Sequence, residues 1–238
     1  MSKLTLVYAY YKNDTMFIHQ QINWNAYSDK VKRDVEIIVT DDCSPQENSI
    51  ENCVQLPYYP NLRLFKILEK VPWNWLECRN IGAKYAKSDW LLLTDIDHMV
   101  TPTVARSLLK RIDRLNKSVV YQLNRIRAVD NKPYKFHNDS FLVSKSLFWG
   151  AGGYDEHYSG LYGTSGSFRR RLLKNASDNI RIPLPLVLYG REVIKDASTT
   201  DFARKEGRDP MDMKRRHATK KGPEIHFKYP YKEIIIEK

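Results

Sequence analysis

The sequence predicts an α/β fold: a single domain built on a mostly parallel sheet with helices on both faces. Short apolar runs rich in β-branched residues alternate along the chain with segments whose apolar residues recur at helical spacing. A length of 238 residues suits one domain with a substantial core. Because ligands bind beyond the carboxyl ends of the strands in such open sheets, the residues that follow each strand are the first candidates for a site.

Apolar runs and turn signals define the expected strands, which cover residues 4–8, 35–40, 62–68, 90–94, 119–123 and 140–143. Helical spacing and capping residues predict helices at 13–26, 47–55, 77–87, from 102 onward, and at 168–174. Two strand-like segments close the chain, at 224–227 and 233–236. The segment between 196 and 223 is charged and poor in apolar residues, which predicts a mobile C-terminal segment.

The composition narrows the class of protein. Apolar residues make up 42% and charged residues 28%, as in ordinary globular domains. No run approaches the roughly 20 apolar residues of a membrane span, and the first residues lack a signal-peptide pattern, so we expect a cytoplasmic protein. Cys43, Cys53 and Cys78 show no CxxC spacing and are expected to be reduced thiols. The net charge of +11 favours an anionic partner, with peripheral contact at the inner face of an anionic membrane left open.

The strongest local motif is residues 90–98 (WLLLTDIDH), an apolar strand that delivers two carboxylates, Asp95 and Asp97. Two carboxylates at a strand end can reach one cation, and oxygen ligands suit Mg²⁺ or Mn²⁺. The alternative is that both acids form a turn or cap the next helix, because an isolated DxD is a weak motif. Arg79, on the helix before this strand, can make bidentate contacts to a phosphate or a carboxylate.

Five segments in a fixed order resemble the family 2 type of GT-A glycosyltransferases: 4–11 (LTLVYAYY), 36–44 (EIIVTDDCS), 79–83 (RNIGA), 91–97 (LLLTDID) and 152–156 (GGYDE). The resemblance covers about residues 3–173. It implies a GT-A fold and a Mn²⁺- or Mg²⁺-dependent enzyme. Such an enzyme transfers a sugar, with inversion, from a nucleotide-sugar donor, first of all a UDP-sugar, to a hydroxyl on a glycan, lipid or protein.

The resemblance also implies residue roles on the nucleotide side. Ala9 and Tyr11 would line the nucleotide pocket. Asp42 would accept a hydrogen bond from the base, and Asp41 would support it. The chain would then divide into a nucleotide-sugar-binding half (1–123), an acceptor-binding half (124–195) and a basic C-terminal lid or tail (196–238).

On the diphosphate side, the resemblance places Arg79 on the donor, Asp95 near the ribose and the metal-bound water, and Asp97 on the metal. His226 is a further candidate metal ligand, because many GT-A enzymes place a histidine near the diphosphate in this part of the chain. A surface role is the plain alternative for any one of six histidines. The basic segment 204–221 is either a solvated loop or a lid that closes over the diphosphate.

The general base departs from the family pattern. Where the family carries Glu-Asp before a helix, this chain has Thr164-Ser165, and a hydroxyl cannot take the proton of an acceptor alcohol. Asp155 and Glu156, in the Gly-rich segment resembling the acceptor motif, are the nearest substitutes, and we take Asp155 first. The alternative for both is a turn with two solvated acids.

Two other functions compete with sugar transfer. A nucleotidyltransferase would be expected to carry a Gly-rich basic loop after the first strand, where this chain has residues 8–13 (YAYYKN). A non-catalytic protein that binds sugar nucleotides or nucleic acid is suggested by the missing Glu-Asp pair and the positive charge. No nucleic-acid recognition motif accompanies the 15 tyrosines and five tryptophans, so no nucleic acid is expected as a partner.

Overall fold

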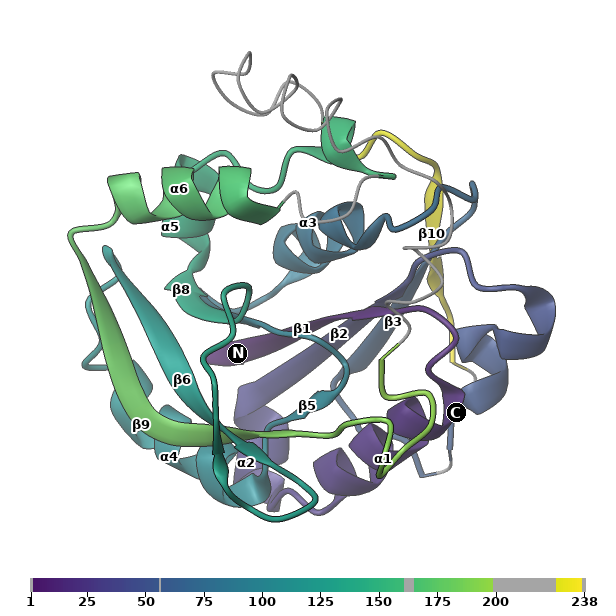
Figure 1. Ribbon diagram of the computed structural model, residues 1–238, viewed down its shortest axis with the longest axis horizontal. Helices are drawn as coiled ribbons and strands as arrows, with labels where there is room; N and C mark the ends of the chain where they lie inside the picture. The colour runs from purple at the N-terminus through teal and green to yellow at the C-terminus, as the bar shows by residue number, and fades with distance from the viewer. Residues whose placement is uncertain (1, 56, 161–164, 199–225, 237–238) are drawn as a thin grey trace.

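A computed structural model describes residues 2–55, 57–160, 165–198 and 226–236. It confirms the α/β architecture: one mixed sheet with helices on both faces (Figure 1). In the view of Figure 1, α3, α5 and α6 lie above the sheet, and α1, α2 and α4 lie below it. Among the described residues, no helix combines the length and the hydropathy needed to cross a membrane.

The strands are β1 (Leu4–Tyr10), β2 (Val35–Asp41), β3 (Leu62–Ile67), β4 (Trp90–Leu93), β5 (His98–Met99), β6 (Val119–Arg127), β7 (Pro133–Tyr134), β8 (Phe141–Ser144), β9 (Asp178–Leu188) and β10 (Tyr231–Ile234). The helices are α1 (Asp14–Asn25), α2 (Asp29–Asp34), α3 (Trp75–Tyr85), α4 (Pro102–Ile112), α5 (Lys145–Gly150) and α6 (Ser165–Asn175). Three short 3-10 helices are η1 (Gln46–Asn48), η2 (Ile50–Cys53) and η3 (Glu156–Tyr158).

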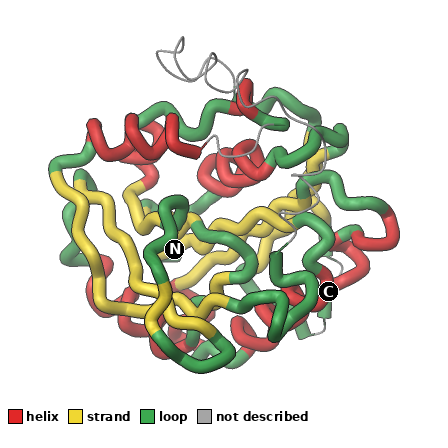
Figure 2. Tube along the Cα trace, viewed as in Figure 1, coloured by secondary structure: helices red, strands yellow, loops and turns green. Residues whose placement is uncertain are grey.

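The strand order is β10-β3-β2-β1-β4-β8-β6-β9-β5, with β7 beside β6. Figure 2 shows the strands in yellow between two groups of helices in red. The block β3-β2-β1-β4 is parallel. On one side of this block β8 runs antiparallel to β4, and on the other β10 runs antiparallel to β3. The carboxyl ends of β1, β2 and β4 therefore share an edge with the amino end of β8.

The central strands are buried on both faces, which their apolar runs predicted. Leu6 and Tyr8 of β1 belong to the core between the sheet and helices α1 and α4. Val7 points to the opposite face and belongs to the core between the sheet and helices α3, α5 and α6. Gly82 sets the distance between α3 and β1, because a Cβ there would lie 2.3 Å from Cγ1 of Val7. This close approach places Arg79, one turn earlier on α3, beside the strand ends.

Several expected elements were wrong in extent. The helix expected at 47–55 is replaced by η1 and η2, because Ser49 between them is extended and the Asp41 carboxylate holds the amides of Ser44 and Ile50. The sequence reading missed β9, whose Pro183 and Pro185 lie at a shift in its register with β6. The last strand is β10, and residues 226–227 belong to no strand. All three cysteines are free thiols, as expected.

Candidate functional site

The carboxyl ends of β1 and β2 form the first part of the site. Asp42 is 6% exposed; its Oδ2 accepts a hydrogen bond from the Asn74 amide at 2.7 Å, and its Oδ1 is buried with no partner among the described residues. Burial raises the pKa of Asp42 well above its ordinary value, with Asp41 and Glu77 adding to the effect. A buried acceptor without a hydrogen-bond partner destabilises the fold, so Oδ1 is suited to accept a hydrogen bond from a ligand.

Asp41 plays a different part from its neighbour. Its Oδ1 accepts from the Ser44 amide at 2.8 Å and its Oδ2 from the Ile50 amide at 3.1 Å. Both oxygens are thus used to shape the loop after β2. The structure places Ala9 and Tyr11 at the end of the adjoining β1, where the Asp42 amide donates to the Tyr10 carbonyl at 2.8 Å. The residues expected at the nucleotide thus lie at one edge of the sheet.

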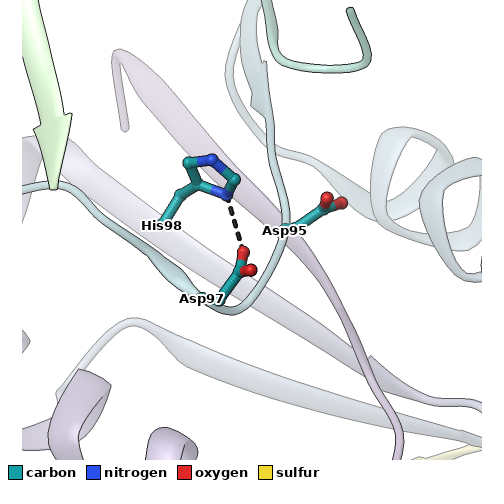
Figure 3. A group of neighbouring side chains, drawn as sticks. All are labelled: Asp95, Asp97 and His98. Carbon is teal, nitrogen blue, oxygen red and sulfur yellow. Dashed lines mark ion pairs between the residues drawn. The ribbon is translucent and has the colours of Figure 1, made fainter. Parts of the chain in front are cut away.

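Asp95, Asp97 and His98 form the second part of the site, immediately beyond β4 (Figure 3). One ligand atom from each lies within 4.8 Å of the others. Asp97 Oδ1 and His98 Nδ1 are 2.7 Å apart, yet in the described structure neither buried atom has a hydrogen bond of good geometry. Paired carboxylate oxygens with an unmet acceptor fit Mg²⁺ or Mn²⁺.

His98 is positioned as a support for Asp97. Arg125 Nη1 lies 2.9 Å from His98 Nε2, and a guanidinium can only donate, so Nε2 accepts and Nδ1 carries the ring proton. Nδ1 then faces Asp97 as a donor and not as a metal ligand. With Arg125 in place, the residues of this group that remain able to hold a metal ion are the two carboxylates.

Arg79 is fully buried and makes three side-chain hydrogen bonds. Nη1 donates to the Asp139 carbonyl at 2.6 Å and to the Tyr154 hydroxyl at 2.9 Å, and Nη2 donates to Asp95 Oδ1 at 2.5 Å. The guanidinium lies 4.6 Å from the ring centre of Trp75. Arg79 was expected to bind the nucleotide-sugar donor, and in this arrangement its guanidinium orients Asp95.

Asp95 is held ionised despite partial burial. Burial acts to raise its pKa, but His137, Arg79 and His98 together lower the pKa to about 2. His137 Nε2 lies 3.3 Å from Asp95 Oδ2. Burial lowers the pKa of His137 to about 3, so that ring is neutral at pH 7. Arg79 is then the positively charged group that contacts Asp95 at this pH.

The structure does not bring the two expected base residues to Asp95. Glu156 is fully buried, and its two oxygens accept from Asn80 Nδ2 at 2.7 Å and from the Lys228 amide at 2.8 Å. Asp155 caps η3 through its Oδ1, at 3.1 Å from the His157 amide. Within the described residues, no hydrogen bond or ion pair joins either carboxylate to Asp95 or Asp97.

His226, the further candidate ligand, is not part of the metal group that the described residues form. Its Nε2 donates to the Gly152 carbonyl at 2.7 Å, and its ring packs against Trp149. Gly152 and Gly153 have φ of 85° and 60°, which confirms the expected Gly-rich turn. The lid expected over 204–221 lies outside the described residues.

Two buried glutamates fasten the last described segment to the domain. Glu77 of α3 accepts from the Tyr229 amide at 3.0 Å and from Asn74 Nδ2 at 2.8 Å, and Glu156 holds Lys228. Burial raises the pKa of Glu77 to about 7. A carboxyl group that also shapes the loop before α3 therefore titrates near neutral pH.

The free energy of unfolding should fall as the pH rises from about 4.5 to 7, because Glu77 keeps its proton in the folded state after the unfolded chain has lost it. The loss should be roughly 3 kcal/mol and complete above pH 7. Glu77→Gln should remove this pH dependence. In urea titrations, the free energy of unfolding of the variant, relative to that of the wild type, should therefore be greater at pH 8 than at pH 5. The exposed Glu69→Gln is the matched control, and equal pH dependence in all three proteins would contradict the assignment.

The sequence reading missed three contributors to this site: His137, Asp139 and Arg125. His137 and Asp139 come just before the strand expected at 140–143, whereas the rule for open sheets points to residues that follow a strand. Burial raises the pKa of the Asp139 carboxyl group. The start of a strand lies at the same edge whenever the strand is antiparallel to its neighbour, as β8 is to β4.

Comparison with solved structures finds the same fold. Among solved structures, S. aureus TarS 1-349 matches with a TM-score of 0.64 and 16% identity, over 82% of this chain and 63% of that one. TarS 1-349 in complex with UDP-GlcNAc gives 0.63 and 17%, over 83% and 61%, and its complex with UDP gives 0.62 and 16%, over 82% and 64%. At such identities the likeness concerns the fold, and the chain spans less than two thirds of those proteins.

No curated protein matches the chain. A family model described as Glycosyl transferase family 2, however, matches residues 24–176, which is more than half of the sequence. The matched range contains Asp42, Arg79, Asp95 and Asp97. The chain belongs to glycosyl transferase family 2.

Proposed function

We propose that this protein is a metal-dependent glycosyltransferase that moves a sugar from a UDP-sugar to a hydroxyl on a glycan, lipid or protein, with inversion. One observation carries the proposal: a carboxylate oxygen of Asp42, buried and without a partner among the described residues, shares a sheet edge with the paired carboxylates Asp95 and Asp97. A nucleotide base and a diphosphate need these two features side by side. The UDP and UDP-GlcNAc complexes of TarS support the same donor class.

In the proposed enzyme, the base and the diphosphate of the donor are bound by different residues. Asp42 Oδ1 accepts a hydrogen bond from the N3–H group of uracil, while Asp41 holds the loop beside it. Asp97 and Asp95 hold Mn²⁺ or Mg²⁺, with His98 and Arg79 fixing their orientations. When bound there, a cation would supply positive charge to offset that of the departing diphosphate.

Thermal unfolding with a panel of nucleotides and UDP-sugars, with Mn²⁺ and with EDTA, tests the proposal. UDP and at least one UDP-sugar should raise the melting temperature, and the rise should need the metal. UDP release from that UDP-sugar then separates an enzyme from a non-catalytic sugar-nucleotide-binding protein. A larger, metal-independent rise with single-stranded RNA would favour the nucleic-acid alternative.

Asp42→Asn should weaken UDP binding by roughly 1–3 kcal/mol. The oxygen of the new side chain can still accept from the backbone amide of Asn74, but its NH₂ group then faces the N3–H group of uracil, and two donors cannot form a hydrogen bond. Calorimetric titration of UDP in the presence of Mn²⁺ measures the change. Inorganic pyrophosphate has no base, so its metal-dependent affinity should be the same in both proteins. If both ligands weaken equally, Asp42 acts through the loop and not through the base.

A further inference from the structure

The segment that leads into β8 brings a carboxylate to the edge of the sheet that carries Asp95. Leu93 pairs with Phe141 in the antiparallel β4–β8 ladder, and the next pair is joined by a 2.9 Å hydrogen bond between the hydroxyls of Thr94 and Ser140. Asp95 and Asp139 are the next residues on the two segments, one step beyond this pair. Both therefore lie at the same edge of the sheet.

Arg79 ties the two positions together. Its Nη1 donates to the Asp139 carbonyl at 2.6 Å, and its Nη2 donates to Asp95 Oδ1. His137 is fixed in turn between Asp95 Oδ2 and the Ser140 hydroxyl. The backbone that carries Asp139 is thus fastened to the metal group on both sides, which is the rigidity that a reacting group requires.

The carboxylate of Asp139 has one oriented oxygen and one unused oxygen. Oδ2 accepts a hydrogen bond from the Ser165 hydroxyl at 2.9 Å. Oδ1 is shielded from solvent and has no hydrogen-bond partner among the described residues. Ser165 is half of the Thr164-Ser165 pair that stands in place of two acids, so Asp139 brings a carboxylate to this point from a different segment, the one before β8.

We propose that Asp139 is the general base of the transfer, in place of Asp155 or Glu156. This inference depends on the proposed function. Asp139 takes the proton of the acceptor hydroxyl while that oxygen forms a bond to the anomeric carbon of the donor. The bond from this carbon to the diphosphate oxygen breaks, and its electron pair leaves with UDP.

The two alternatives are less well placed. Both oxygens of Glu156 are occupied by Asn80 and Lys228. Asp155 caps η3 through its Oδ1, and its Oδ2, like Oδ1 of Asp139, is buried without a hydrogen-bond partner among the described residues. Unlike the Asp139 residue, however, Asp155 has no hydrogen bond or ion pair to Arg79 or Asp95 within the described residues. Asp155→Asn is therefore the matched control for Asp139→Asn.

The test measures UDP release from the best UDP-sugar of the panel, with Mn²⁺ present, and UDP affinity separately. Asp139→Asn should lower kcat by about 10²–10⁴-fold and change the UDP affinity less than about twofold, because the proton moves only in the transition state. Asp155→Asn should keep near wild-type turnover. Asp139→Asn/Ser165→Asp should regain part of the lost turnover, since the new carboxylate starts 2.9 Å from the old one and suits the first residue of α6.

Other results would overturn either the assignment of Asp139 or the proposed function. Wild-type turnover in Asp139→Asn, or its loss in Asp155→Asn alone, overturns the assignment. If Asp139→Asn does not fold, Ser165→Ala replaces it, and that variant should lose turnover several-fold with unchanged UDP affinity; unchanged turnover overturns the assignment. A wild-type protein that neither binds UDP nor releases it from any UDP-sugar refutes the proposed function itself.

Discussion

Replacement of Asp97 by alanine should abolish Mn²⁺-dependent binding of UDP and leave the fold intact. The Asp97 side chain makes no good hydrogen bond among the described residues, whereas its carbonyl, which the substitution keeps, accepts from the Tyr189 amide at 2.9 Å. Loss of a carboxylate that binds the metal directly should cost more than the roughly 10–100-fold typical of supporting residues. Calorimetric titration of UDP with Mn²⁺ and with EDTA measures the effect.

The control for this variant is Asp113→Ala. Asp113 forms a surface ion pair with Lys3, which precedes β1 and so lies at the opposite end of the parallel strands from Asp97; its loss should not change UDP binding. If Asp97→Ala still binds UDP more tightly with Mn²⁺ than with EDTA, the Asp95-Asp97 pair is a structural turn and not a metal site.

Replacement of Arg79 by methionine should destabilise the protein and also weaken donor binding. Methionine fills much of the arginine stem but leaves the Asp139 carbonyl, the Tyr154 hydroxyl and Asp95 without their donor. Loss of this network should reduce the free energy of unfolding by roughly 3 kcal/mol. For a chain of this length that loss lowers Tm by about 10 °C. Thermal unfolding and UDP titration on the same samples measure both effects.

Arg63→Met provides the matched control. Arg63 also donates to a carboxylate, Glu233, and lies over the rings of Phe65 and Tyr85, but at the β3–β10 edge away from the metal group. This variant should lose some stability and keep its UDP affinity. Equal UDP affinity in the two variants, measured below their melting temperatures, would show that Arg79 serves only the fold.

The sequence was sufficient to locate the site wherever parallel strands define it. Asp42, Asp95 and Asp97 each follow a strand of the parallel block, and the rule that ligands gather at carboxyl ends finds all three. His137 and Asp139 precede β8, which runs the other way, and strand direction cannot be read from an apolar run. Pairing between strands is a tertiary property, so the second side of the site became visible only with the sheet order.

Other departures have equally local causes. The Asp41 carboxylate competes with helix formation by holding two amides of the loop at 44–50, which outweighed the helical pattern there. Histidine spacing carried no information about His226, because its partner Gly152 is 74 positions away. Arg125 had no signal in the sequence either, since its effect on His98 depends on which ring nitrogen it meets.

The pairing of β10 with β3 also bears on how the protein folds. Arg63 and Glu233, which bridge these strands, are 170 positions apart, so β3 has no outer neighbour until that length of chain has been synthesised after it. During that interval its backbone amides and carbonyls form an open edge on which another nascent chain can add a strand. Closing so long a loop is also slow. Late arrival of β10 therefore makes the interval before sheet completion the period in which this protein is most exposed to aggregation, and a chaperone that covers the β3 edge should raise its folding yield.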